Sequence, residues 1–169
     1  MKLGILLGSF DPIHIGHLCM AQNALNENLV DNVIFVPAYQ NPWKSKSTDY
    51  GNRYCMTKFA IKNMKKCSIS NIELDTPEPH YTSDTLKYLK EIYPNDELYL
   101  LIGEDVHNDI SKWHEGEWIL SNFKFIMYSR NVYNISSTEI RNLIKENKQI
   151  YPLVPESVCE YIAINNLYK

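Results

Sequence analysis

Two histidines in a glycine-containing segment are the residues of this chain best suited to chemistry. The segment GSFDPIHIGH, residues 8–17, follows a short apolar run and opens a stretch with helical spacing. At such a strand-to-helix turn, backbone N–H groups and a helix N-terminus can bind an anion. Gly16 lets a ligand approach the backbone closely. His14 and His17 are three residues apart, so both rings can face the same way and donate to one phosphate chain.

The two histidines have other interpretations. They could satisfy backbone groups of the turn, or they could bind zinc. Two histidines together with two glycines at one turn favour an anion site over a role in satisfying the backbone groups of the turn. No third and fourth ligand at zinc spacing lie near them in the sequence, so we assign no protein metal ligand.

A second candidate anion site is the segment ISSTEIR, residues 135–141. Its three hydroxyl residues precede a predicted helix, and Arg141 lies four residues after Ser137, on the same helix face. Hydroxyls and N–H groups in front, with a bidentate cation behind, would hold a phosphate. A capping box formed by Ser136 and Glu139 is compatible with the same pattern.

Two further segments contain residues that could recognise a nucleotide. In YTSDTL, residues 81–86, hydroxyls surround a predicted helix start, which suits an anion or plain N-capping by Thr82 or Ser83. Asp105 follows a predicted strand, where a carboxylate can accept hydrogen bonds from ribose hydroxyls or cap a helix. Trp113 offers a flat face for an aromatic base, although a packing role is equally compatible with its type.

Alternating strand and helix patterns must position these segments. The apolar strand runs do not alternate with polar residues, which predicts a parallel sheet covered by helices on both faces. In such sheets ligands bind beyond the carboxyl ends of the strands. We expect strands at 2–7, 32–36, 68–74, 98–102 and 123–128, and helices at 16–28, 53–66, 82–92, 117–120, 137–147 and 155–165. The polar stretch 38–52 is expected to be a loop, and we see no linker or repeat, which predicts one domain over 1–169.

Composition excludes several classes of function. The chain has 169 residues and a net charge of −3, and only three of its 17 cationic residues are arginines. No bulk positive charge would attract nucleic acid or an anionic membrane. No apolar stretch reaches the length of a membrane span, and the apolar N-terminal run lacks the features of a signal peptide. The four scattered cysteines favour reduced, mostly buried thiols and a cytoplasmic location.

The 8–17 segment resembles the phosphate-binding signature of the nucleotidylyltransferase superfamily. With the segments at 81–86, 101–114 and 135–141, the chain looks most like the bacterial nicotinate-nucleotide adenylyltransferases. The resemblance implies a single Rossmann-like α/β domain that transfers AMP from ATP to nicotinate mononucleotide, giving deamido-NAD and pyrophosphate. Magnesium would arrive with the ATP, without dedicated protein ligands. The oligomeric state stays open, a homo-oligomer included.

The resemblance also implies roles for individual residues. Trp113 would stack on the nicotinate ring beside the backbone of His114, and Thr85 would help to hold the pyridine carboxylate. The catalytic candidates are His14, His17, Lys44 and Arg141. The ATP-binding candidates are Gly8, Ser9, Phe10, His14, Gly16, His17, Gly103, Asp105, Ile135, Ser136, Ser137, Thr138 and Arg141. The substrate-binding candidates are Lys44, Thr82, Thr85, Trp113, His114 and Arg130.

The chain departs from the family pattern at two places. Trp43 stands where the family usually has histidine before its lysine, and the segment between Arg130 and Ser136 is shorter than usual. We expect Arg53 to be structural. Preference for the amide mononucleotide, another small substrate such as phosphopantetheine, and a non-catalytic nucleotide-binding module stay open as alternatives.

Overall fold

Five parallel strands form the centre of the protein. The computed structural model describes residues 1–40, 47–129 and 135–169. The strands are β1 (Lys2–Gly8), β2 (Asn32–Pro37), β3 (Cys67–Ile69), β4 (Glu97–Gly103) and β5 (Lys124–Tyr128). Their order in the sheet is β3-β2-β1-β4-β5 and every neighbouring pair is parallel. Strands β2 and β3 are thus added on one side of β1, and β4 and β5 on the other. The strand order reverses between β1 and β4, and in open parallel sheets ligands bind at such a reversal point.

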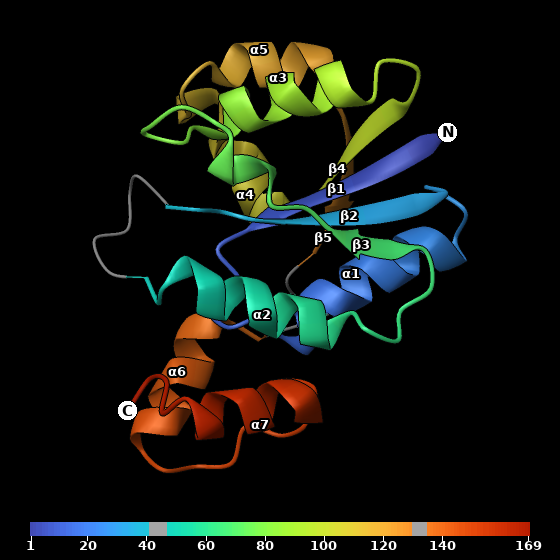
Figure 1. Ribbon diagram of the computed structural model, residues 1–169. Coiled ribbons are helices and arrows are strands. Elements are labelled where there is room, and N and C mark those ends of the chain that lie inside the picture. Colours follow the sequence, from blue (N-terminus) through green and yellow to red (C-terminus); the bar gives the residue numbers. More distant parts are fainter. Residues whose placement is uncertain (41–46, 130–134) are drawn as a thin grey trace.

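Helices cover both faces of the sheet (Figure 1). On one face lie α1 and α2, with α6 and α7 packed below α2; on the other lie α3, α4 and α5. The helices are α1 (Ile15–Asn26), α2 (Tyr50–Ala60), α3 (Thr82–Ile92), α4 (Glu104–Asp109), α5 (Gly116–Asn122), α6 (Ser137–Lys145) and α7 (Glu156–Ile164), with short 3-10 turns η1 (Ile72–Leu74) and η2 (Ile110–Lys112). No helix in the described parts of the chain is long and apolar enough to cross a membrane.

The sheet separates two apolar cores. Phe35, Met56 and Ile140 belong to the core between the sheet and α1, α2, α6 and α7. Ile5 and Leu86 belong to the core under α3 and α5. Central strands with apolar side chains on both faces explain why their sequences do not alternate, and the predicted doubly covered parallel sheet is confirmed.

Most predicted elements are present, and the differences are local. The predicted strand at 68–74 is a three-residue strand followed by the turn η1, and α4 was not predicted. Asp49 caps α2 by accepting from the Gly51 N–H, so the predicted loop ends earlier than residue 52. The predicted cap of α3 by Thr82 or Ser83 is wrong, because Tyr81 is the N-cap and no side chain caps it. The four cysteines are free thiols, half-buried rather than mostly buried.

Candidate active site

A cavity of about 330 Å³ lies at the carboxyl ends of β1, β4 and β5. Segments far apart in the sequence line it: residues 9–20 after β1, 101–106 at the end of β4, 128–129 after β5, and the start of α6. The cavity lies at the reversal point of the sheet order, where the fold predicts a ligand site. Predicted ATP-binding residues that line the cavity are Ser9, Phe10, His14, Gly16, His17, Gly103, Asp105, Ile135, Ser136, Ser137, Thr138 and Arg141.

Side chains from distant elements bind the carbonyl oxygens of the loop after β1. Arg53 Nη1 donates to the Ser9 carbonyl at 2.7 Å, and Arg141 Nη1 donates to the Asp11 carbonyl at 2.7 Å. Ser137 Oγ donates to the Pro12 carbonyl at 2.9 Å. A loop with its carbonyls engaged in this way is held in one conformation and presents less negative charge to an anion in the adjacent cavity.

His14 and His17 form a stacked pair on the cavity wall. Their ring centroids are 3.7 Å apart with an interplanar angle of 26°, and Phe10 contacts the His17 ring edge-on at 5.0 Å. The His14 backbone N–H donates to His17 Nδ1 at 3.3 Å. Since Nδ1 is an acceptor there, the proton of the His17 ring is on Nε2, which is the nitrogen able to donate to a ligand.

Burial keeps His14 uncharged. Its side chain is 7% exposed, and desolvation lowers its pKa from 6.5 to about 4. Its Nδ1 atom is buried and has no hydrogen-bond partner among the described residues. A buried polar atom without a partner is costly, and here it belongs to a side chain that lines a cavity. The His14 side chain therefore presents part of its ring to the cavity, while its Nδ1 atom faces the start of α1.

The start of α6 supplies hydroxyls and a guanidinium. Ser136 Oγ accepts from the Glu139 N–H at 3.1 Å, which is the Ser136 half of the capping box that the sequence suggested. Arg141 Nη2 donates to Thr138 Oγ1 at 3.1 Å, and Nη1 makes the Asp11 contact. These bonds fix the guanidinium with two of its five N–H donors, and the remainder can serve a ligand.

Two glycines make room for neighbouring side chains. A Cβ on Gly103 would lie 2.6 Å from Asp105 Oδ1, so glycine allows the carboxylate to sit against the end of β4. A Cβ on Gly8 would lie 2.8 Å from the Phe10 ring. Phe10 itself has a φ of 46°, a left-handed conformation that is unusual for a bulky residue. Gly8 does not line the cavity, so its role in the structure is to admit the Phe10 ring.

Four of the predicted substrate-binding residues are described by the structure, and none of them lines this cavity: Thr82, Thr85, Trp113 and His114. Thr85 is fully buried, and its hydroxyl donates to Glu73 Oε1 at 3.0 Å. The Tyr39 N–H donates to Glu73 Oε2 at 2.7 Å. Burial raises the pKa of Glu73 to about 7, against the lowering effect of these two hydrogen bonds. Thr85 is thus part of a buried polar cluster centred on a carboxyl group that the sequence analysis missed.

His114 and Trp113 follow the turn η2 on the same side of the sheet as α3. The His114 ring stacks on Tyr81 with centroids 4.1 Å apart and an angle of 8°, and its Nδ1 lies 3.0 Å from Ser83 Oγ. Trp113 is half-buried against the core under α3 and α5. Thr82 opens α3 in the same region. The structure therefore brings Thr82 and His114 to one neighbourhood, separate from the cavity.

Lys44 and Arg130, together with Trp43, lie outside the described residues. Arg53 is 1% exposed and donates to four carbonyls, those of Thr48, Ser9, Ala38 and Tyr39. Burial lowers its pKa, but an arginine remains charged in a protein. The structural role expected for Arg53 agrees with this geometry.

Three residues that the sequence analysis did not single out organise the site: Asp11, Glu73 and Tyr168. The sequence signal for Glu73 was a carboxylate between two apolar residues, Ile72 and Leu74. Asp11 is part of the segment 8–17, in which the chemistry was assigned to the two histidines. Tyr168 has no local signal, because its partner Asp11 lies 157 residues away in the sequence.

The fold and the cavity define an α/β protein with a cavity lined by histidines, hydroxyls and an arginine at the reversal point of a parallel sheet. Comparison with known proteins agrees. The Cytidylyltransferase-like family model matches residues 5–143. A probable nicotinate-nucleotide adenylyltransferase of Flavobacterium johnsoniae is 39% identical, with all of both chains covered, and one of Thermus thermophilus is 36% identical with the same coverage.

Among solved structures, nicotinic acid mononucleotide adenylyltransferase of Plasmodium falciparum, complexed with NaAD, matches with a TM-score of 0.80 and 25% identity over 99% of this chain and 97% of that one. The same Plasmodium protein complexed with APC matches with a TM-score of 0.79 and 25% identity, covering 99% and 96%. The chain therefore belongs to the cytidylyltransferase-like family and, within it, to the nicotinate-nucleotide adenylyltransferases.

Proposed function

We propose that this protein transfers the adenylyl group of ATP to nicotinate mononucleotide, releasing pyrophosphate and forming the dinucleotide deamido-NAD. The observation that carries the proposal is the cavity after β1, where two histidines, an arginine and three hydroxyl residues from two distant motifs meet. Relatives over the full length bear the corresponding name, and the Plasmodium relative was solved with NaAD. A cytoplasmic location remains a prediction from the cysteine pattern.

The reaction needs no general base from the protein. The 5′-phosphate of the mononucleotide is already an anion at neutral pH, and one of its oxygens attacks the α-phosphorus of ATP. The new P–O–P bond forms as the bond between the α-phosphorus and the bridging oxygen to the β-phosphate breaks. Pyrophosphate leaves with the electron pair of that bond. Catalysis then depends on in-line positioning and on stabilising negative charge.

The residues of the cavity suit that task. We assign the donation of His17 Nε2–H to an oxygen of the reacting phosphates, because Nδ1 is held by the His14 backbone. Neutral His14 would contact the same phosphates through the part of its ring that lines the cavity. Arg141 and the α6 hydroxyls would bind the β- and γ-phosphates, where charge accumulates as pyrophosphate leaves. Lys44 would add a further cation.

Magnesium is proposed to enter as part of the ATP complex. The cavity is lined by histidines, hydroxyls and an arginine, which suit phosphate oxygens, and by two carboxylates, those of Asp11 and Asp105. Mg²⁺ prefers several oxygen ligands from carboxylates, phosphates and water, so two carboxylates alone would not enclose it. Both carboxylate oxygens of Asp11 already accept hydrogen bonds, from Tyr168 and from the Thr48 N–H. In the described parts of the chain, no group of three or more His, Cys, Asp or Glu side chains could hold a metal ion. When bound, magnesium would neutralise charge on the triphosphate.

The test is a pyrophosphate-release assay with ATP and one acceptor at a time: nicotinate mononucleotide, nicotinamide mononucleotide or phosphopantetheine. We expect the acid mononucleotide to give the highest kcat/KM and the dinucleotide product to be detectable by mass. A higher kcat/KM for the amide would reassign the substrate. ATP binding without turnover on any acceptor would overturn the proposal in favour of a binding module.

A further inference from the structure

The segment after α7 turns back to the cavity loop. Tyr168 follows the end of α7 and packs half-buried against the core that contains Ile140. Its hydroxyl donates to Asp11 Oδ1 at 2.7 Å. Its φ is 67°, in the left-handed region that a bulky residue rarely adopts. A tyrosine in that conformation must be held by its surroundings, which here are the apolar core and the Asp11 carboxylate.

Asp11 joins Tyr168 to the proposed phosphate-binding groups. The Asp11 side chain is 7% exposed, and its second oxygen accepts from the Thr48 N–H at 3.2 Å. Its backbone carbonyl accepts from Arg141 Nη1 at 2.7 Å. One residue thus connects the C-terminal segment, the residue before the N-cap of α2 and the guanidinium of Arg141. A shift of Asp11 would move the carbonyl against which Arg141 is aligned.

The phenol is a donor throughout the neutral range. Burial and the hydrogen bond to Asp11 raise the pKa of Tyr168 above its ordinary value, so the hydroxyl keeps its proton. A neutral O–H donating to a carboxylate makes a stronger hydrogen bond than one between two neutral groups. The contact can therefore hold the carboxylate in one orientation.

We propose that Tyr168 is a positioning residue for ATP: through its hydrogen bond to Asp11 it aligns the 9–12 backbone and the Arg141 guanidinium with the triphosphate. The inference rests on the proposed function, because it takes the cavity as the ATP site. Tyr168 does not line the cavity, so it acts through Asp11 and not by contact with the ligand.

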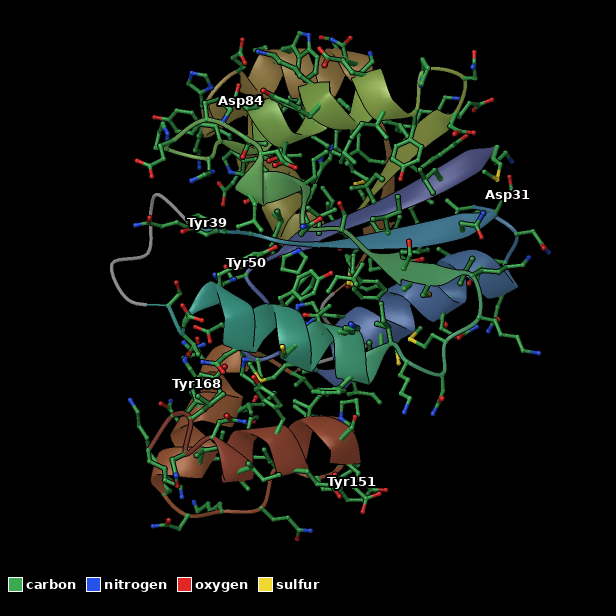
Figure 2. All side chains as sticks on the ribbon, in the orientation of Figure 1. Asp31, Tyr39, Tyr50, Asp84, Tyr151 and Tyr168 are labelled. Atoms are coloured by element: carbon green, nitrogen blue, oxygen red, sulfur yellow. The ribbon has the colours of Figure 1, made fainter. Side chains whose placement is uncertain are left out.

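Tyr168→Phe removes the hydroxyl and retains the ring. We expect the dissociation constant of ATP, measured by calorimetry without the second substrate, to rise about fivefold to tenfold. The KM for nicotinate mononucleotide should change less than about twofold. The thermal midpoint should fall by about 3 to 8 °C, because one hydrogen bond to a buried carboxylate is lost while the ring still packs in the core. The matched control is Tyr151→Phe. Tyr151 is 58% exposed, and Figure 2 shows it on the side of α7 away from Tyr168.

A double-mutant cycle separates positioning from plain structure. If Tyr168 acts through Asp11, Tyr168→Phe should weaken ATP binding less than about twofold in an Asp11→Ala background, in which no side-chain acceptor remains. Unchanged ATP affinity in Tyr168→Phe would overturn the proposal. The proposal would also be overturned if the fold-change in the ATP dissociation constant of the double variant equalled the product of the two single fold-changes. A loss of thermal stability in Tyr168→Phe large enough to explain the weaker ATP binding would overturn it as well. If the wild type binds ATP but makes no dinucleotide, the proposed function fails and this binding test still decides the role of Tyr168. A wild type that binds no ATP would overturn both.

Discussion

The two sides of the proposed substrate path hold their polar groups in opposite ways. On the phosphate side, residues 9–17 and 136–141 meet around one cavity, and the loop carbonyls are bound by Arg53, Arg141 and Ser137. On the pyridine side, residues 73–85 and 113–114 satisfy one another, and the Thr85 hydroxyl is bonded to Glu73. The polar groups of the first side thus surround an open cavity, whereas those of the second side are bonded to one another.

Burial shifts the pKa of one group on each side, in opposite directions. It lowers the pKa of His14 to about 4 and raises that of Glu73 to about 7, so that in each case the neutral form is favoured. Because His14 is neutral, it adds no positive charge to the cavity beside Arg141. A Glu73 that titrates near neutrality makes the pyridine side sensitive to pH.

The largest expected effect is on the phosphate side. His17→Ala removes the Nε2–H donor and should lower kcat about 10²-fold to 10³-fold, with a much smaller effect on the binding of ATP or mononucleotide, because the donated bond matters most as charge shifts between phosphates. Steady-state kinetics with both substrates varied would measure this split. His107→Ala, whose ring contacts Phe125 and does not line the cavity, is the control. Normal turnover in His17→Ala would remove this residue from the catalytic role.

A second prediction concerns the pH dependence of stability, to which His14 and Glu73 contribute in opposite directions. The His14 pKa is lower when folded than its ordinary 6.5, so His14 contributes stability above pH 6.5 that is lost as pH falls toward 4. The Glu73 pKa is higher when folded than its ordinary 4.5, so Glu73 contributes stability below pH 4.5 that is lost as pH rises through 7. Each contribution amounts to about 3 kcal/mol at most, and between pH 4.5 and 6.5 they oppose each other.

When either group is removed, the pH dependence of the free energy of unfolding should therefore be set by the other group. In urea unfolding from pH 4.5 to 7.5, Glu73→Gln should become more stable relative to wild type as pH rises, and His14→Asn more stable relative to wild type as pH falls. Glu91→Gln, at an exposed position of α3, should follow the wild-type curve. Parallel curves for wild type and Glu73→Gln would show that Glu73 is not protonated more readily in the folded protein.

The sequence predicted the phosphate side far better than the pyridine side. Residues 8–17 and 135–141 are contiguous motifs at helix starts, so local spacing already places His14 near His17 and Ser137 near Arg141. Thr85 was found as well, but the hydroxyl cluster at 82–85 was interpreted as an anion site or a helix cap. Its actual partners, Glu73 and His114, come from other elements and lie 12 and 31 residues from Thr85 and Ser83 respectively.

The same distinction explains the fold. The strands of the central sheet were predicted because each is a short apolar run, and their parallel order followed from the alternation with helices. The helix α4 was missed because it is six residues long with no buried residue, so it has no apolar periodicity to detect. The contact between Tyr168 and Asp11 depends on how α7 packs beneath α2 (Figure 1), which no local pattern encodes.

The smallest expected effect separates two roles of one hydroxyl on the phosphate side. Ser136 Oγ accepts from the Glu139 N–H, which uses a lone pair and leaves its O–H able to donate to a phosphate. Ser136→Ala should lower the free energy of unfolding by about 1 kcal/mol, and Ser136→Gly by a few tenths, because glycine is a tolerable N-cap and alanine is not. Both should weaken ATP binding about threefold to tenfold, since both lose the donor. Urea unfolding and ATP calorimetry on the two variants give the comparison. If ATP affinity instead follows stability, with Ser136→Gly binding as wild type does, then Ser136 acts at the phosphate side only as the cap of α6.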